Sequence, residues 1–280
     1  MNANCLNQKN IEIYLHYLKE QEKSTGTLEK YKRELYELLT FLSAKNESKE
    51  ELISWKAKLE QKYCPAGVNG RLVATNGFFC FFGRYDLRMK LLRIQKEIFA
   101  KEEKELTKAE YARLVHAAEK KGNQRLSLVI QTICATGIRV SELQYITMDS
   151  LKKGRAEVNC KGKRRVIFLP GELQRKLKHY VKEKGITAGV IFRTRTRRPL
   201  NRCSIWSDMK KLCKDAQVNP QKVFPHNLRH LFARTFYGLE KDIAKLADLL
   251  GHSNIETTRI YIMESGREHQ EKLEKMKLIL

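Results

Sequence analysis

The sequence lacks any apolar run of the roughly 20 residues that a membrane-spanning helix needs. Its beginning, MNANCLNQKN, also lacks the hydrophobic segment of a secretion signal. These two absences argue against a helical membrane protein and against a conventional secreted one. We therefore expect a cytoplasmic protein that does not enter a membrane.

Recognisable metal and nucleotide motifs are missing as well. The seven cysteines are scattered, odd in number and without a C-x-x-C pair, which favours neither a disulfide framework nor a cysteine zinc site. The chain has no P-loop and no H-E-x-x-H motif. His226 and His230 are spaced like a metal-binding pair, but no third ligand is evident. We predict that the protein uses no metal ion and no other cofactor.

Acidic residues are scarce relative to basic ones. The chain has 55 Lys and Arg against 32 Asp and Glu, a net charge of +23. Residues 152–215 hold 20 basic and 5 acidic side chains, whereas residues 1–100 hold 17 and 12. Because an ordinary surface mixes both signs, this local excess indicates a polyanionic partner. The sequence contains no basic amphipathic helix with an aromatic face, which a membrane-surface protein would need. We therefore expect the polyanion to be nucleic acid.

The first hundred residues have the apolar spacing of amphipathic helices. Residues 11–23, 27–44, 49–63 and 67–85 repeat apolar side chains at helical intervals, which predicts a compact four-helix unit. A charged stretch then leads to Thr107, which can form a capping box with Glu110 at the start of a new helix. We place a domain boundary near residue 104, between a helical domain of residues 1–104 and a second domain of residues 105–280.

Helices and strands are mixed beyond this boundary. A buried helix ends at Gly137, and a second one is expected over residues 140–148. Residues 155–160 and 164–170 have strand patterns on either side of the sequence KGK, which predicts a tight hairpin. Further helices are expected over residues 173–184, over 201–217 and from 226 onward. The predicted fold class is mainly α with a small β-sheet (α+β).

The segment LLGHSNIETTRIYIM, close to the end of the chain, carries a tyrosine soon after a predicted helix start. Ser253 and Glu256 have the spacing of a capping box, so the helix should begin at about Asn254 and carry Thr257 and Tyr261 on one side. Considered alone, Tyr261 is most simply a buried aromatic residue whose hydroxyl meets a backbone partner.

Four other segments contain side chains suited to catalysis: ATGIRVSEL, CKGKRR, PHNLRHLF and LGHS. Taken singly, each has an ordinary explanation. Arg139 could pair with Glu142 on a helix surface, Lys161 could be a solvated hairpin residue, and His252 could bind a backbone carbonyl. In the third segment, spacings of three and four residues place three polar side chains on one helical face: His226, Arg229 and His230.

Taken together and in this order, the segments resemble the tyrosine recombinase family, also called phage-type integrases, and especially its Xer-like two-domain members. The family pattern has a T-G-x-R-x-x-E box, a hairpin lysine, an H-x-L-R-H box, a G-H box, and a tyrosine nine residues after the last histidine. The matching residues are Thr136 to Glu142, Lys161, His226 to His230, Gly251, His252 and Tyr261. The resemblance implies an N-terminal core-binding domain, a mixed catalytic domain and a C-terminal helix.

The resemblance also implies the reaction. Tyr261 would attack a DNA phosphodiester and form a 3′-phosphotyrosine, which a second 5′ hydroxyl can reverse without ATP or metal. His226 would accept the proton of the tyrosine. Lys161 would protonate the leaving 5′ oxygen, although Lys163 could replace it if the hairpin shifted by two residues.

Two arginines are expected to bind the phosphate. Guanidinium groups stabilise the charge on its non-bridging oxygens through paired hydrogen bonds, and Arg139 and Arg229 are the candidates. His252 and His230 would donate to the same phosphate or hold these arginines in place. Glu142, one helical turn from Arg139, is better suited to support that arginine than to act as a base.

The expected partner is double-stranded DNA, bound along its phosphates by the basic region. We predict that six residues of this region contact DNA: Lys163, Arg164, Arg165, Arg195, Arg197 and Arg198. Leu273, Met276 and Leu280 form a stripe near the C-terminus. The resemblance implies that this C-terminal helix docks on a neighbouring protomer to form dimers and tetramers on DNA, although it could instead pack on its own domain.

Two other functions remain possible from the sequence. A type IB topoisomerase uses the same tyrosine chemistry but rejoins the same strand as a monomer. A catalytically silent DNA-binding regulator could retain the fold, although the complete catalytic set argues against it. Neither the DNA target nor the choice among dimer resolution, inversion and integration or excision of a mobile element follows from the sequence.

Overall fold

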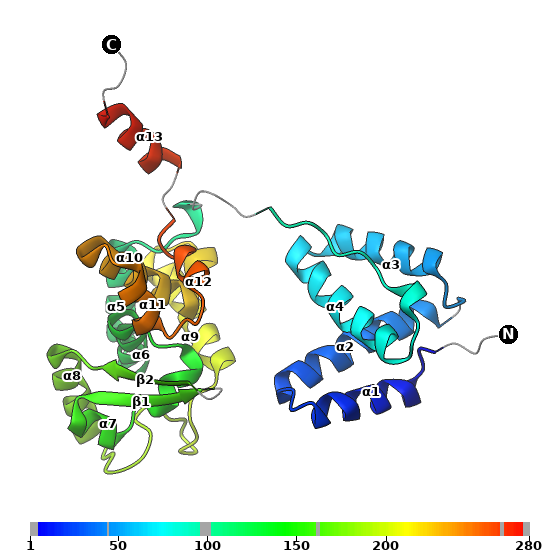
Figure 1. Ribbon diagram of the computed structural model, residues 1–280. Helices are drawn as coiled ribbons and strands as arrows, with labels where there is room; N and C mark the ends of the chain where they lie inside the picture. Colours follow the sequence, from blue (N-terminus) through cyan, green and yellow to red (C-terminus); the bar gives the residue numbers. More distant parts are fainter. Residues whose placement is uncertain (1–4, 44, 96–101, 161–162, 264–265, 277–280) are drawn as a thin grey trace. The chain divides into compact units, whose positions relative to one another are not determined.

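The computed structural model describes residues 5–43, 45–95, 102–160, 163–263 and 266–276. The chain divides into two compact units, Met1–Lys96 and Glu97–Leu280 (Figure 1). The expected boundary near residue 104 lies a few residues further along. None of the described helices is both long and apolar enough to cross a bilayer.

The first unit consists of the four expected helices followed by one short helical turn. They are α1 (Gln8–Glu20), α2 (Thr25–Leu42), α3 (Lys49–Lys62), α4 (Pro65–Phe81) and the 3-10 helix η1 (Tyr85–Leu87). Leu35, Leu38, Leu72 and Phe78 are fully buried between them. The helical spacing read from the sequence therefore corresponds to one shared apolar core.

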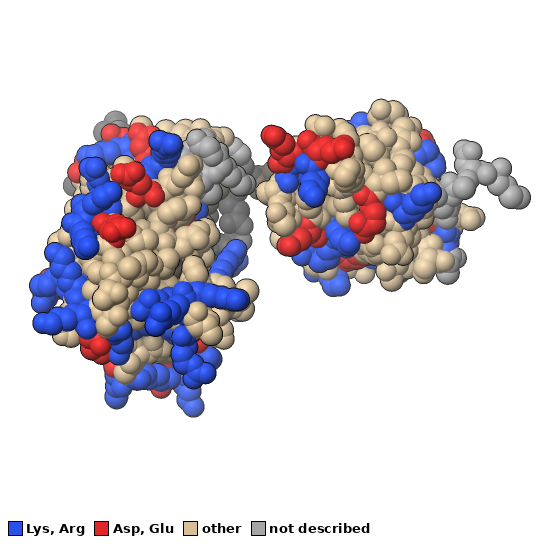
Figure 2. Space-filling view, turned by 90° about the horizontal axis from the view of Figure 1, so that it is seen from below, with Lys and Arg blue, Asp and Glu red and all other residues tan. Residues whose placement is uncertain are grey.

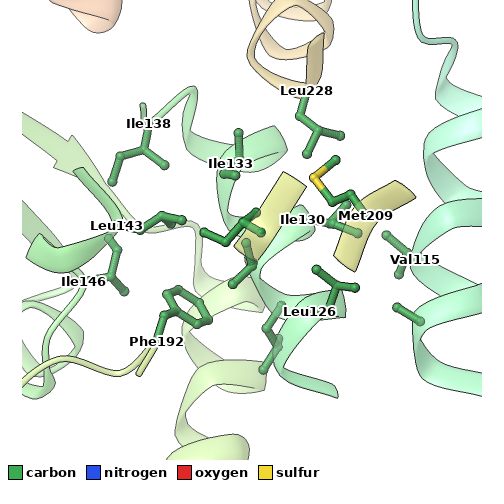
Figure 3. Close-up of a cluster of buried hydrophobic side chains, with 14 of the residues drawn as sticks. Val115, Leu126, Ile130, Ile133, Ile138, Leu143, Ile146, Phe192, Met209 and Leu228 are labelled. Carbon is green, nitrogen blue, oxygen red and sulfur yellow. The ribbon is translucent and has the colours of Figure 1, made fainter. Parts of the chain in front are cut away.

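The second unit packs helices around α6 and carries one small sheet (Figure 1). Its elements are η2 (Glu102–Lys104), α5 (Lys108–Lys120), α6 (Gln124–Thr136), η3 (Val140–Tyr145), α7 (Met148–Lys153), β1 (Arg155–Cys160), β2 (Lys163–Phe168), α8 (Gly171–Glu183), α9 (Arg202–Ala216), η4 (Pro220–Lys222), α10 (Pro225–Glu240), α11 (Ile243–Leu250), α12 (Ile255–Arg259) and α13 (Gly266–Lys275). Ile130 and Ile133 of α6 lie in the centre of the core, beside Met209 of α9 and Leu228 of α10 (Figure 3). The predicted class, mainly α with a small β-sheet, is confirmed.

The sheet is the predicted hairpin. β1 and β2 are antiparallel, with Arg155 opposite Phe168 and Val158 opposite Arg165. Ile167 is buried, whereas Phe168 is 65% exposed, so alternate residues of β2 face the core and the solvent. By this alternation Arg165 belongs to the inward-facing set.

Three local predictions were wrong. The segment predicted as one helix over residues 140–148 is the 3-10 helix η3 up to Tyr145, and its last residue, Met148, already begins α7. Asn254, rather than Ser253, caps α12 by accepting a hydrogen bond from the N–H of Glu256. α12 ends at Arg259, and the Tyr261 N–H closes a tighter turn on the Thr258 carbonyl at 2.9 Å. Tyr261 therefore follows the helix instead of lying within it.

Candidate active site

The site begins where α6 ends at Gly137. This residue has φ +62°, a conformation that glycine adopts without strain, and a Cβ there would lie 2.5 Å from the ring of Phe232. The chain turns and enters η3, where the Arg139 N–H donates to Glu142 Oε2 at 2.8 Å. The arginine of the T-G-x-R-x-x-E box is thereby fixed at the start of a new element.

Glu142 is a buried carboxylate that binds the Arg139 side chain. Arg139 Nη1 lies 3.0 Å from Glu142 Oε1, and the two side chains are 38% and 3% exposed. Burial alone would raise the pKa of Glu142. The Arg139 N–H and the Arg165 guanidinium outweigh burial and hold that pKa below its usual value. Glu142 is therefore ionised at neutral pH and acts as a counter-charge.

Arg229 is almost fully buried, at 2% exposure, on α10. Its guanidinium donates to the Gly137 carbonyl, to the Leu250 carbonyl at 2.7 Å, and to His252 Nε2 at 3.0 Å. Burial, followed by the charge of Arg139, lowers the pKa of Arg229 to about 10. The group is still charged at neutral pH and forms a fixed cation inside the unit.

His252 is held between Arg229 and Thr258. Its Nδ1 lies 2.8 Å from the Thr258 hydroxyl, and Thr258 is completely buried. Because arginine can only donate, Nε2 must accept, so the proton resides on Nδ1 and is donated to Thr258. Burial and the nearby arginines lower the pKa of His252 to about 4, so the ring is neutral at pH 7. In this arrangement His252 orients Arg229.

Tyr261 lies against the histidines of α10. Its ring stacks on His230 with centroids 4.2 Å apart, and its hydroxyl lies 3.3 Å from His226 Nε2. Burial and then the arginines, first among them Arg229, lower the pKa of His226. A neutral imidazole beside a phenol can accept its proton. Tyr261 is only 5% exposed, so its position is fixed by packing.

A pocket of about 900 Å³ opens beside these groups. Its lining includes Arg139, Ser141, Arg202, Trp206, His226 and Arg229. Three arginines on one concave surface favour an anion such as a phosphate group. Among the residues that the structure describes, no three His, Cys, Asp or Glu side chains come together as a metal site.

The predicted hairpin and loop residues have different positions. Lys161 lies outside the described residues, and the same is true of the Lys163 side chain. Arg164 is exposed on β2, and exposed side chains also occur at Arg195, Arg197 and Arg198. Arg165 does not lie on the expected DNA-facing surface, because its side chain is 11% exposed and bound to Glu142. Its inward direction on β2 is the physical reason.

The phage integrase family model matches residues 104–267, more than half of the chain. The chain belongs to the phage integrase family. Among curated family relatives, it is 27% identical to tyrosine recombinase XerA of Pyrococcus furiosus, over all of this chain and 98% of that protein. It is 28% identical to tyrosine recombinase XerD of Halalkalibacterium halodurans, over 90% and 92% of the two chains.

Solved structures of integrases share the fold. A lambda integrase dimer bound to a COC′ core site has a TM-score of 0.76 and 17% identity, over 93% of this chain and 96% of that one. XerA recombinase has a TM-score of 0.54 and 22% identity, over 97% and 99% of the two chains. At these identities the likeness establishes the architecture of this integrase family member.

Several residues around the candidate site of this integrase family member could not be predicted from the sequence. No sequence pattern indicated a role for Thr258, because a threonine in a predicted helix is common and its contact with His252 cannot be read from the sequence. Arg202 and Trp206 line the pocket, yet their pattern is that of any exposed helix face. The inward direction of Arg165 could have been found, since it lies two residues before the buried Ile167 and therefore on the same face of β2.

Proposed function

We propose that this protein is a site-specific DNA recombinase that cleaves and rejoins DNA through a 3′-phosphotyrosine on Tyr261. One observation carries the proposal. The Tyr261 hydroxyl lies 3.3 Å from His226, and His226 lines an arginine-rich pocket. A nucleophile, a neutral base and a phosphate-binding surface are thus within reach of one another.

In the cleavage step, Tyr261 Oη attacks the phosphorus and transfers its proton to His226 Nε2. The bond to the 5′ oxygen breaks, and the phosphate remains attached to the tyrosine. Arg139 and Arg229 stabilise the negative charge that gathers on the non-bridging oxygens. The pKa of His226 lies below its ordinary value, so the imidazole is unprotonated at neutral pH before the attack.

The leaving 5′ oxygen takes a proton from Lys161, by family resemblance, with Lys163 as the alternative donor. Because the phosphotyrosine is itself a phosphate ester, a second 5′ hydroxyl can attack it and release the tyrosine. The sequence of bonds balances without ATP hydrolysis. Cleavage of one strand and joining to another then yields recombination.

Double-stranded DNA is the proposed partner. Figure 2 shows Lys and Arg side chains in groups on the second unit, with few Asp or Glu side chains between them. Arg164, Arg195, Arg197 and Arg198 are exposed there and available to phosphates. Among the related structures are a lambda integrase dimer on a core site and a lambda integrase tetramer on a Holliday junction.

We further propose that residues 1–104 bind the DNA core site and that residues 105–280 cleave it, in a DNA-bound tetramer. Leu273 of α13 and Met276, directly after it, are 54% and 55% exposed, as apolar residues that dock on a neighbouring protomer would be in an isolated chain. Leu280 lies outside the described residues. Assembly through the C-terminal helix accounts for this exposure.

A suicide substrate tests the chemistry. The DNA that flanks the gene is footprinted to find the binding site, and a duplex of that site is nicked so that the cleaved fragment escapes. We expect the protein to accumulate a covalent adduct. Tyr261→Phe should bind with the same affinity and form none. Adduct formation by Tyr261→Phe would refute the nucleophile, whereas tight binding of the unaltered protein without adduct would support a silent regulator.

A second assay separates recombination from topoisomerase activity. A plasmid with two copies of the footprinted site should give recombinant products, and DNA-bound dimers and tetramers should form. Relaxation of a supercoiled circle without exchange between the sites, by a monomer, would favour a type IB topoisomerase.

A further inference from the structure

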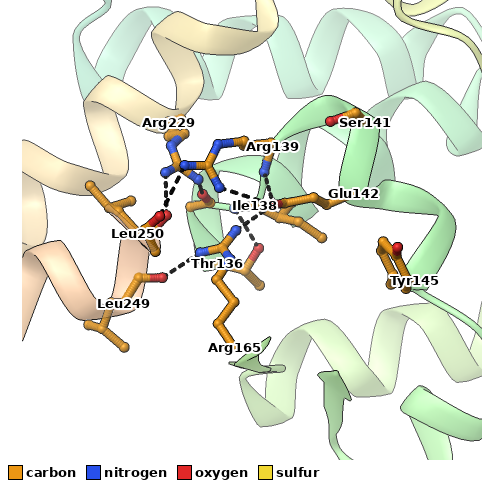
Figure 4. A network of polar contacts seen from close by, with 12 residues as sticks. Thr136, Ile138, Arg139, Ser141, Glu142, Tyr145, Arg165, Arg229, Leu249 and Leu250 are labelled. Atoms are coloured by element: carbon orange, nitrogen blue, oxygen red, sulfur yellow. Dashed lines mark hydrogen bonds and ion pairs between the residues drawn. The ribbon is translucent and has the colours of Figure 1, made fainter. Parts of the chain in front are cut away.

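The C-terminal end of α11 collects arginine side chains from three separate elements (Figure 4). Leu249 O accepts from Arg165 Nη1 at 2.5 Å, and Leu250 O accepts from Arg229 Nη2 at 2.7 Å. The next carbonyl, of Gly251, lies 3.4 Å from Arg139 Nη2. The last carbonyls of a helix have no partners within it and form the negative end of its dipole. They offset the repulsion among three neighbouring cations.

Arg165 binds a second acceptor besides this helix end. Its Nη2 contacts Glu142 Oε2, while Glu142 Oε1 binds Arg139 at 3.0 Å. One guanidinium on β2 therefore connects the carboxylate of η3 to the end of α11. Arg139 and Arg229 belong to the proposed phosphate site, but Arg165 is not among the residues that line the pocket.

The backbone around Arg165 is shaped to admit it. Gly251 has φ +65°, and a Cβ there would lie 2.6 Å from Arg165 Cδ. A side chain at position 251 would therefore displace the arginine, in addition to the strain of the left-handed conformation. His252, which orients Arg229, follows directly. The glycine thus permits the close packing of β2 against the turn that carries the histidine.

We propose that Arg165 is a positioning residue that ties Glu142 to the C-terminal end of α11 and so sets Arg139, Arg229 and His252 at the scissile phosphate. The inference rests on the proposed function, because it assigns these three groups to the reaction. A planar guanidinium can donate to a carboxylate and a carbonyl at once. A lysine retains the charge but, as a compact point charge, does not reproduce this geometry. A DNA contact, the role expected from the charge count, is incompatible with a side chain that is 11% exposed.

The test compares Arg165→Lys and Arg165→Gln with Arg155→Gln, which removes an exposed arginine of the same hairpin, on β1, that has no assigned contact with DNA. Hydrogen exchange is measured first, on the DNA-free protein. We expect both Arg165 variants to exchange faster at residues 249–252 and along β2, with α6 unchanged. If all parts of the second unit exchange faster in Arg165→Gln, that variant has lost its fold. The result for Arg165→Lys then decides the test. Unchanged exchange at residues 249–252 in both variants would show that Arg165 does not hold the end of α11, and the proposal would be wrong.

Single-turnover cleavage is measured next, with saturating protein on the suicide substrate. We expect the Arg165 variants to cleave about 10²-fold more slowly, since small displacements of catalytic groups have effects of that order, while DNA affinity is unchanged. Arg155→Gln should cleave at the normal rate once bound. Normal cleavage by both Arg165 variants would overturn the proposal. If the Arg165 variants exchange faster at residues 249–252 but the unaltered protein does not cleave DNA, the positioning role of Arg165 is supported and the proposed function is refuted.

A modified substrate identifies which step Arg165 serves. Sulfur in place of the bridging 5′ oxygen gives a leaving group that needs no protonation. If Arg165 acts through the arginines on the non-bridging oxygens, the defect of Arg165→Lys should persist on this substrate. Full rescue would assign Arg165 to the proton donor of the hairpin and contradict the proposed role.

Discussion

At the scale of single residues, the orientation of His252 depends on the hydroxyl group of Thr258. The buried hydroxyl accepts from Nδ1, and this leaves Nε2 to accept from Arg229. Without that hydroxyl, the imidazole can turn or take its other tautomer, and Arg229 loses a partner. The hydroxyl thus supports Arg229, one of the two arginines of the proposed phosphate site.

We expect Thr258→Val to slow adduct formation by on the order of 10- to 100-fold, as the loss of orienting partners does at metal-bound histidines. Valine keeps the shape and the burial, so the unfolding temperature should change little. Thr258→Ser restores the hydroxyl and should cleave at close to the normal rate. The measurement is single-turnover adduct formation, and equal rates for the valine and serine variants would show that the hydroxyl does not matter.

Single residues also show which contacts of the candidate site could be predicted from the sequence. The contact between Arg139 and Glu142 was expected from their spacing and is present. The burial of Arg229 was not, because spacing on a helix predicts a face but not what packs over it. Arg165 was grouped with surface arginines because counting charge ignores the direction in which a strand points each side chain.

At the scale of elements, the sequence predicted whether a segment is a helix or a strand better than it predicted where that element begins and ends. The hairpin and the four N-terminal helices have periodic patterns and formed where expected. η3 and α12 are short, and capping contacts decide their geometry, so periodicity carried little information about them. The capping box predicted at Thr107 is present, with both of its hydrogen bonds to Glu110, whereas Asn254 replaced Ser253 at α12. Two adjacent capping residues compete, and the sequence does not rank them.

Helix α10 and the turn after α11 hold two partly buried histidines, His230 and His252. Burial, followed by neighbouring charges, lowers the pKa of His230 and of His252 to about 4 in each case. An unfolded chain has the ordinary value of about 6.5 and therefore binds more protons between these two values. The free energy of unfolding must then fall as the pH decreases from about 6.5 towards 4.

We expect His230 to destabilise the second unit by at most about 2 kcal/mol when the pH falls from 7 to 5. The half-buried His252 should contribute less, because solvent screens its interactions. His230→Phe keeps a ring against Tyr261 but cannot take up a proton, so its loss of stability over this range should be smaller by up to that amount. His179→Gln is the control, since the His179 side chain is 74% exposed. Denaturant unfolding at the two pH values measures the difference, and parallel pH dependence in His230→Phe and the unaltered protein would contradict it.

At the scale of the whole molecule, the excess positive charge should act through particular residues. The exposed arginines of the loop after Phe192 lie close to the candidate site, because Cys203 lines both the cavity beside Arg195 and the pocket that Arg139 and Arg229 line. Helix α8 lies in the same basic stretch of sequence but contributes nothing to that pocket. Removing the same charge from the loop and from α8 should therefore change the affinity for DNA by different amounts.

We compare two triple variants with the same change in net charge. One replaces Arg195, Arg197 and Arg198 by Gln, and the other replaces Arg175, Lys178 and Lys182, which are exposed on α8. Each arginine that neutralises a phosphate releases counterions, so the loop variant should reduce the slope of log affinity against log salt by about 1 per residue. The α8 variant should change the slope much less, because its side chains act only through the general field. Affinity for the footprinted duplex is measured from low to physiological salt. Equal slopes in the two variants would mean that the DNA does not follow the loop, and the contacts assigned to Arg195, Arg197 and Arg198 would then be wrong.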